Sequence, residues 1–561
     1  MQKKKLVYTG MVTLMSLALV GCGGNKATDK DVSKNDDKSD KKEVLAKDQV
    51  LKTNVTQEMP TADISLSTDV ISAVALNNCY EGIYRLGKDS QPELAGATEK
   101  AEVSEDGKIY KVKLKEDAKW SDGKPVTAAD YVYSWQRTVD PKTASEYAYL
   151  HGCVKNAEDI IAGKKDKSEL GIKAVSDYEL EIELDRATPY FDYLLAFSTF
   201  MPQRQDIVEK WGKDYATTSE KSVYNGPFVL AEFDGPGTDT EWSYKKNDQY
   251  WDKKVVKLDE VKVSVVKEAS TSLNLYQDNK AEEITLSGEL AQQMANDPEY
   301  VIDKKASVTW LEMNMRDEKS PFKNENLRKA IAYSIDRKAL VNQILGDGSV
   351  DVQGIVPADM AKNPESGQDF VKDSGKHLSY NEEKAKDYWE KAKKELKVDS
   401  LKFDILASDT DSSKKVIEYI QGAIQDTLEG VKVTVSPVPF AVRLDRSNSG
   451  DFDTVLSGWN ADYADPSSFT DLFVTGNSYN RGHYTSKDYD AKVKASAVEH
   501  ATEPEKRWQD MVDAEKIIMD DMGVVPVYQK AEAHLRTAKV KDLVVHSTGA
   551  PFTYKWAYKV E

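Results

Sequence analysis

Serine, lysine and histidine side chains are among the groups in this chain that could carry out covalent or metal chemistry. A Ser-x-x-Lys tetrad lies at Ser412–Lys415, a spacing found in some serine hydrolases. It stands at the start of a polar helix without companion motifs, and a lysine-rich chain produces it by chance. The chain has no phosphate loop, no dinucleotide-binding glycine motif, no nucleophile elbow and no His-Glu-x-x-His. The histidines never pair at metal-ligand spacing: His151, His377, His483, His500, His534 and His546. The sequence therefore favours neither an enzyme nor a cofactor site.

The sequence that precedes Cys22 predicts a covalent modification of its thiol. The chain begins with a lysine-rich stretch and an apolar run from Leu6 to Gly21, shorter than the roughly 20 residues of a bilayer-spanning helix. This pattern is typical of a secretory signal peptide, here residues 1–21. The run ends in Leu-Val-Gly-Cys, which is similar to the bacterial lipobox, where cleavage before the cysteine leaves its thiol to be acylated. We expect Cys22 to carry the lipid, with an uncleaved signal anchor as the alternative.

The residues after Cys22 are polar and charged. Residues 22–50 contain too few large apolar side chains to offset the entropy of ordering, and therefore predict a disordered tether. A lipid anchor with a long tether suits the outer face of the cell membrane beneath a thick wall, as in a Gram-positive bacterium. The net charge of −18 becomes −21 without residues 1–21, which disfavours nucleic-acid binding.

The remaining 500 or so residues are expected to form more than one lobe of mixed helices and strands. Alternating apolar side chains predict strands, and apolar side chains at helical spacing predict helices. The expected strands are 108–115, 178–184, 261–266 and 431–435. The expected helices begin at Thr127 and cover 324–345, 381–396 and 503–522. Cys79 and Cys153 are expected to be buried free thiols, although an exported protein could join them.

A resemblance to a known family comes from six blocks in a fixed order. The block at 115–137 reads KEDAKWSDGKPVTAADYVYSWQR and resembles the signature of the oligopeptide-binding proteins, which are extracellular solute-binding proteins of family 5. The other five blocks match in the order expected of that family: 78–85, 140–147, 224–228, 327–337 and 459–466. The resemblance extends from about residue 60 to the end of the chain.

The resemblance implies an α/β fold of the periplasmic-binding-protein type (type II, cluster C), with three domains and two lobes hinged around a ligand cleft. It also implies where the domains begin and end. Domain I would comprise residues 51–89, 219–305 and 530–561, domain II residues 90–218, and domain III residues 306–529.

The resemblance also implies ligand-binding residues. Peptides share a backbone and charged termini, so a receptor for many sequences must bind those features. The match gives the peptide α-ammonium to Asp462, for which the alternative is a loop aspartate that caps the turn before Pro466. It gives the peptide backbone and side chains to Thr68, Asp69, Val70, Tyr147, Gly458, Trp459, Asn460 and Ala461. Glu312 and Tyr528 are weaker candidates. Relatives have an arginine for the peptide carboxylate where this chain has Leu456, so ligand length stays open.

The implied function is a monomeric receptor that captures short peptides and passes them to the permease of an ABC importer with separate ATPase subunits. Several alternatives remain open at this point. They are a receptor for one signalling peptide such as a pheromone, a receptor for a nickel chelate or a sugar, a surface peptidase and an adhesin. An α-ammonium partner at Asp462 argues against chelates and sugars, because those ligands lack that group.

Overall fold

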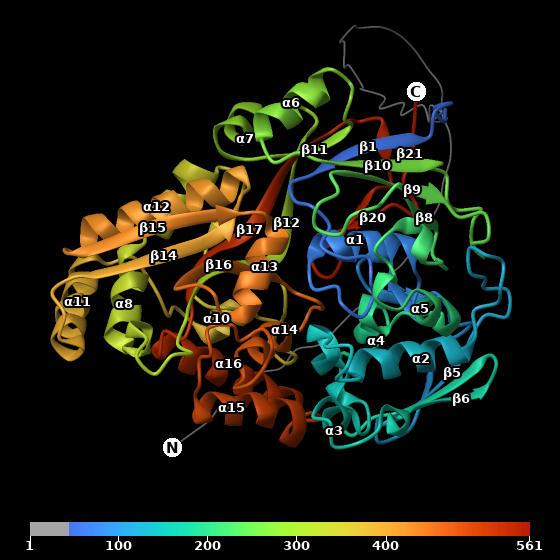
Figure 1. Ribbon diagram of the computed structural model, residues 1–561, viewed down its shortest axis with the longest axis horizontal. Coiled ribbons are helices and arrows are strands. Elements are labelled where there is room, and N and C mark those ends of the chain that lie inside the picture. The colour runs from blue at the N-terminus through green and yellow to red at the C-terminus, as the bar shows by residue number, and fades with distance from the viewer. Residues whose placement is uncertain (1–43) are drawn as a thin grey trace, which may run out of the picture. The chain divides into compact units, whose positions relative to one another are not determined.

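The structure, a computed structural model, describes residues 44–561 (Figure 1). The expected signal peptide (1–21), Cys22 and the tether as far as residue 43 lie outside the described residues. The described part begins before the tether's expected end at residue 50. Leu45 forms a bridge with Val560, and the Ala46 N–H donates to the Lys559 carbonyl oxygen at 2.9 Å. Backbone hydrogen bonds thus join this segment, which contains Val44, Leu45, Ala46 and Val50, to the folded part.

One large mixed sheet runs through the described residues, in the order β15-β14-β16-β12-β17-β11-β1-β10-β9-β8, with β13 paired to β17. Its strands are β1 (Val50–Val55), β8 (Phe228–Ala231), β9 (Glu241–Lys246), β10 (Glu260–Val265), β11 (Glu283–Leu286), β12 (Tyr300–Met313), β13 (Val350–Asp351), β14 (Leu401–Ser408), β15 (Val431–Val438), β16 (Thr454–Asn460) and β17 (Val525–Arg536). The long antiparallel strands β12 and β17 lie in its middle (Figure 1). All five residues from Val525 to Gln529 are buried, as expected for a strand covered on both faces.

A second sheet, β4-β5-β7-β6, lies entirely within residues 90–218. Its strands are β4 (Glu102–Val103), β5 (Ile109–Lys113), β6 (Ile172–Ser176) and β7 (Glu179–Glu183). Three short pairs complete the strands: β2 (Tyr84–Leu86) with β3 (Pro92–Leu94), β18 (Val540–Lys541) with β21 (Tyr558–Lys559), and β19 (Val544–Val545) with β20 (Phe552–Thr553). The domain boundaries given above stay a prediction.

Helices cover the sheets and connect their strands (Figure 1). They are α1 (Val70–Cys79), α2 (Ala128–Val139), α3 (Ala157–Ile161), α4 (Phe191–Leu194), α5 (Gln205–Trp211), α6 (Ala269–Gln277), α7 (Gly288–Met294), α8 (Glu325–Ser334), α9 (Arg337–Ala339), α10 (Phe370–Ser374), α11 (Glu382–Leu396), α12 (Asp411–Thr427), α13 (Phe440–Ser449), α14 (Ser467–Thr470), α15 (Lys487–Lys494) and α16 (Pro504–Asp520). Within residues 44–561, no helix has both the length and the apolar character needed to span a bilayer.

The strands β14, β15 and β16 form the part of the sheet that matters most for a ligand. β14 pairs parallel to β15 and to β16, with α12 connecting β14 to β15 and α13 connecting β15 to β16. All three strands therefore point their carboxyl ends the same way. In open α/β sheets, ligands bind outside those carboxyl ends.

Most expected elements are present with small shifts at their ends. The predicted strands correspond to β5, β7, β10 and β15, and two predicted helices correspond to α11 and α16. The single helix expected over 324–345 is wrong. It stops at Ser334, Ile335 is extended, and the Asp336 carboxylate accepts hydrogen bonds from the N–H groups of Lys338 and Ala339, which start a new turn. A capping aspartate competes with the continuing helix for backbone donors, and here it overrides the apolar periodicity.

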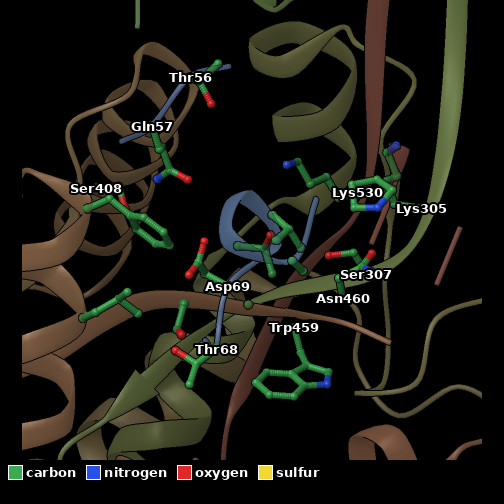
Figure 2. A pocket seen from close by; sticks show the side chains of 18 of the residues that line it. Thr56, Gln57, Thr68, Asp69, Lys305, Ser307, Ser408, Trp459, Asn460 and Lys530 are labelled. Atoms are coloured by element: carbon green, nitrogen blue, oxygen red, sulfur yellow. The ribbon is translucent and has the colours of Figure 1, made fainter. Parts of the chain in front are cut away.

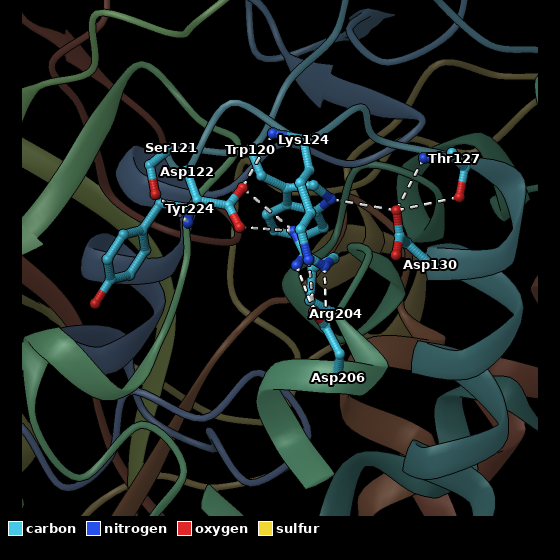
Figure 3. Close-up of polar contacts among 9 residues, drawn as sticks. All are labelled: Trp120, Ser121, Asp122, Lys124, Thr127, Asp130, Arg204, Asp206 and Tyr224. Carbon is cyan, nitrogen blue, oxygen red and sulfur yellow. Dashed lines mark hydrogen bonds and ion pairs between the residues drawn. The ribbon is translucent and has the colours of Figure 1, made fainter. Parts of the chain in front are cut away.

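The block at 115–137 is a structural unit (Figure 3). Thr127 and Asp130 form the expected capping box at the start of α2. The Asp130 carboxylate also accepts a hydrogen bond from the indole N–H of the fully buried Trp120 at 3.2 Å. Arg204 approaches Asp122 at 3.2 Å and Asp206 at 2.7 Å. These contacts fix a loop to a helix start, and none of these residues lines the cavity described below.

Replacing Asp130 with alanine should destabilise the protein through this unit. The change removes the N3 partner of the capping box and the acceptor of a buried indole N–H, which together correspond to about 2–4 kcal/mol. Urea unfolding measures the loss. The half-exposed Asp122 provides the matched control, since Asp122→Ala should cost less than about 1 kcal/mol. Equal losses from the two variants would contradict this role of Asp130.

Cys79 and Cys153 are both buried free thiols, as expected. Burial raises the pKa of each thiol, so neither favours the reactive thiolate form.

Candidate functional site

A cavity opens beside the carboxyl ends of β14 and β16 (Figure 2). With its open mouth it encloses about 1430 Å³ of empty space. Nine of the predicted binding residues line it, although they come from distant parts of the chain: Thr68, Asp69, Val70, Tyr147, Gly458, Trp459, Asn460, Asp462 and Tyr528. Ala461 and Glu312 are not among its lining residues. The fold therefore brings together most of the predicted site.

Asp462 has the chemistry expected of an ammonium ligand. Its side chain is buried, Oδ1 accepts a hydrogen bond from the Tyr147 hydroxyl at 3.0 Å, and Oδ2 has no partner among residues 44–561. Burial raises the pKa of Asp462 to about 8, with the Tyr147 bond opposing that rise. A carboxylate that is out of water and short of partners stabilises a cation placed next to it.

The alternative role considered for Asp462, capping the turn at Pro466, is filled by Asp465 instead. Asp465 accepts the Ser467 N–H at 3.0 Å and forms two 2.7 Å hydrogen bonds with Arg507. Those partners hold the pKa of Asp465 below its usual value despite its burial. Within the described part of the chain, no backbone N–H donates to the Asp462 carboxylate. The two aspartates thus have different roles, and only Asp462 faces the cavity.

The strand β16 has an edge with no strand beside it. β12 pairs along its whole length, but β14 pairs with it only at Thr454 and Val455. From Leu456 to Asn460, the side of β16 toward β14 has no strand partner among residues 44–561, and all five of these residues line the cavity. We call residues 456–460 the open edge. Unpaired backbone N–H and C=O groups along such an edge are a template for an added strand.

Position 458, within the open edge, needs a glycine because the backbone of β12 lies too close for a side chain. A Cβ atom there would lie 2.9 Å from the Val308 carbonyl oxygen and 3.3 Å from the Thr309 Cα. A side chain would therefore push the two strands apart.

Residues 68–70, where the chain enters α1, also line the cavity. Asp69 caps that helix: its Oδ1 accepts the Ser72 N–H at 2.9 Å, while its Oδ2 has no hydrogen-bond partner among the described residues. Burial raises the pKa of Asp69 to about 6. Thr68 precedes it outside any helix or strand. Asp69 therefore combines a structural role with a place on the cavity wall.

Aromatic rings close one side of the cavity. Trp459 lies edge-on to Tyr479 at 4.5 Å and to Tyr147 at 5.9 Å between ring centroids. Tyr147 also packs edge-on against Phe197 at 5.3 Å. Trp459 is thus both a cavity wall and a core residue, and Tyr147 presents its hydroxyl to Asp462.

The two predicted residues outside the lining have structural partners. The Ala461 N–H donates to the Ala306 carbonyl oxygen at 2.8 Å. The buried Glu312 accepts the Trp310 indole N–H at 3.0 Å and the Gly482 N–H at 3.2 Å.

Sequence reasoning missed several lining residues. They include Ser408, Thr410, Ser412 and Ser413 at the end of β14 and the start of α12, and the charged Lys305, Arg443, Arg481, Lys530 and Glu532. The hydroxyl-rich run at 408–413 was a signal that could have been noticed. Lys415 of the Ser-x-x-Lys tetrad does not line the cavity and lies 3.7 Å from Asp411. Among residues 44–561, no three His, Cys, Asp or Glu side chains are grouped as a metal site.

Known proteins share both the sequence and the fold. The family model "Bacterial extracellular solute-binding proteins, family 5 Middle" matches residues 91–481. A dipeptide-binding protein of Lactococcus lactis subsp. cremoris is 35% identical over 568 residues, covering 99% of each chain. OppA of Listeria monocytogenes bound to peptide superposes with a TM-score of 0.89 at 41% identity, covering 92% of this chain and 100% of that one. The structure of the pheromone receptor PrgZ gives 0.88, with the same identity and coverage.

The fold class expected from the sequence is confirmed by these likenesses, which extend over nearly all of the described residues. The chain belongs to the bacterial extracellular solute-binding proteins of family 5.

Proposed function

We propose that this protein is a receptor that captures short peptides in an extended conformation and delivers them to an ABC-type peptide importer. The observation that carries the proposal is the open edge of β16, which ends two residues before the unpaired carboxylate oxygen of Asp462. The relatives described as dipeptide-binding and peptide-bound proteins support the same ligand class.

The peptide would bind as an added strand. The backbone N–H and C=O groups on one side of the peptide pair with the open edge, and those on its other side would face residues 68–70 when the cleft closes. Its α-ammonium meets Asp462 just beyond the end of β16, so the peptide runs antiparallel to that strand. Backbone and terminus are common to all peptides, so this mode accepts many sequences.

Binding rather than catalysis fits the chemistry of the cavity. The serine of the Ser-x-x-Lys tetrad lines it, but the lysine is directed to Asp411. The ligand's energy would go into closing the two lobes. The closed form would dock on a permease whose transport is driven by separate ATPase subunits.

The proposal extends to the cell surface. Acylation of Cys22 after removal of residues 1–21 would hold the receptor on the outer face of the cell membrane, with the residues that follow as a tether. The sequence pattern around Cys22 supports this part of the proposal. Labelled palmitate in cells would be incorporated by the natural chain and not by Cys22→Ala, whereas incorporation by both would refute the anchor.

A second candidate is a receptor for one signalling peptide. The likeness to the pheromone receptor PrgZ favours it, with a TM-score of 0.88. The two candidates differ in selectivity, because a dedicated receptor would separate peptides of equal length by large factors in affinity.

Native mass spectrometry of the chain lacking residues 1–22, followed by sequencing of co-purified molecules, tests the proposal. A general peptide receptor should carry a mixture of short peptides that exchange with added peptide. A single peptide sequence would favour the signalling candidate. A protein that ignores a peptide library but takes up a nickel chelate or a sugar would overturn both.

A further inference from the structure

The charged side chains that line the cavity fall into two groups. Most of them neutralise one another. Lys530 and Lys305 share the Glu532 carboxylate at 2.6 and 3.4 Å, and Arg481 donates to Asn448 at 2.8 Å and approaches Glu146 at 3.8 Å. Asp69, Arg443 and Asp462 form no ion pair within the described part of the chain.

Arg443 is the cation in the unpaired group. Its guanidinium makes no hydrogen bond within residues 44–561, and its Nε is buried without a partner. It stacks over the Phe440 ring at 4.9 Å. Asp69 and Glu312 are near enough to favour its charged form, yet burial and the neighbouring Arg481 lower the pKa of Arg443 to about 9. The Arg443 side chain is only partly buried where it lines the cavity, so its unpaired guanidinium can bind an anion that enters there.

Arg443 and Asp462 line the cavity from the two segments that flank β16, α13 before the strand and the loop after it. Arg443 lies in the first turn of α13, near enough to Glu312 for that carboxylate to favour its charged form, and Glu312 pairs with Val455 next to the open edge. Asp462 lies seven residues beyond Val455, which corresponds to about 23 Å of extended chain. The aspartate and arginine side chains reach inward by several ångströms each. The remaining span fits an extended peptide of about four residues.

We propose that Arg443 receives the α-carboxylate of the bound peptide, so that the cleft holds both charged ends and favours peptides of about four residues. The inference rests on the proposed peptide-binding function. It also accounts for Leu456 at the position where relatives have an arginine, because a guanidinium from α13, the helix that leads into β16, lines the same cavity. A guanidinium can bind a carboxylate through two parallel hydrogen bonds, which fixes its position.

Isothermal titration of tetraalanine and its C-terminal amide tests the inference. The natural protein should bind the free acid at least tenfold more tightly than the amide, and a series from two to eight alanines should give the tightest binding near four. In Arg443→Met the acid should lose that advantage while the amide binds as before. Arg443→Lys should keep part of it, since the charge remains without the paired geometry.

Arg446→Met is the matched control on the same helix, because Arg446 pairs with Asp451 at the surface and does not line the cavity. It should leave the preference for the acid unchanged. Equal affinity for acid and amide in the natural protein, or an undiminished preference in Arg443→Met, overturns the inference. The comparison in the natural protein decides even if the methionine variant fails to fold. Failure to bind either peptide is a different result, which counts against the proposed function itself.

Discussion

Asp462→Asn should weaken peptide binding by at least a hundredfold and at the same time stabilise the ligand-free protein at pH 8. The loss of binding follows because a buried ammonium without its counter-charge costs several kcal/mol. Asparagine keeps the shape of the side chain and an oxygen that can accept the Tyr147 hydroxyl. Titration calorimetry measures the affinity, and urea unfolding without peptide measures the stability.

The raised pKa of Asp462 explains why Asp462→Asn should stabilise the ligand-free protein and not destabilise it. The folded protein holds this proton up to about pH 8, whereas the unfolded chain releases it near pH 4. Because the folded state keeps a proton that the unfolded state has lost, stability falls as pH rises from about 4 to 8, by at most about 1.4 kcal/mol for each pH unit. Asparagine removes that penalty, and the gain should vanish at pH 4.

Asp465→Asn is the control for this prediction. It removes one partner of the buried pair with Arg507, so it should destabilise the protein by about 3–5 kcal/mol. A role for Asp462 in the structure of the loop would make Asp462→Asn destabilising as well, and that result would contradict the account.

The affinity for peptides should reach its maximum near pH 8. Below that pH, Asp462 of the empty protein holds a proton that it must release to meet the ammonium, so the affinity should fall by up to tenfold for each unit of pH. Above it, the peptide α-amine, with an ordinary pKa of about 7.7–8.0, loses the charge that the carboxylate binds.

Proton release gives this prediction a direct measurement. Titrations at pH 6 in buffers of different ionisation enthalpy should show close to one proton released for each peptide bound. A peptide whose α-amine is acetylated has no ammonium to offer and should release none. An affinity that stays constant from pH 6 to pH 8 would mean that Asp462 is already ionised in the empty cleft.

Periodicity in the sequence predicted those elements whose stability comes from burying one face. The stripe of Ala385, Trp389 and Ala392 is buried in α11, and the alternation along β5 and β7 is present in the structure. Periodicity failed at Asp336, where a single capping side chain starts a new helical turn although the apolar pattern continues. Local hydrogen bonding of that kind leaves little trace in the spacing of apolar residues.

The site was predictable only through resemblance, because its geometry joins remote parts of the chain. Tyr147 and Asp462 share a hydrogen bond although 315 positions separate them. Arg443 was missed for a related reason. An arginine on an amphipathic helix usually faces water, and whether it is paired depends on which other elements surround it. The surface pair of Arg446, three residues later, has the same appearance in the sequence.

The central claim is that Asp462 holds the peptide α-ammonium, and a double-mutant cycle tests it most directly. Four affinities are measured: a tetrapeptide and its N-acetyl derivative, each with the natural protein and with Asp462→Asn. The account predicts that either change alone costs at least a hundredfold and that both together cost little more than one, since each removes the same ion pair. Penalties that simply multiply would contradict it, because they would place the ammonium and Asp462 in separate interactions.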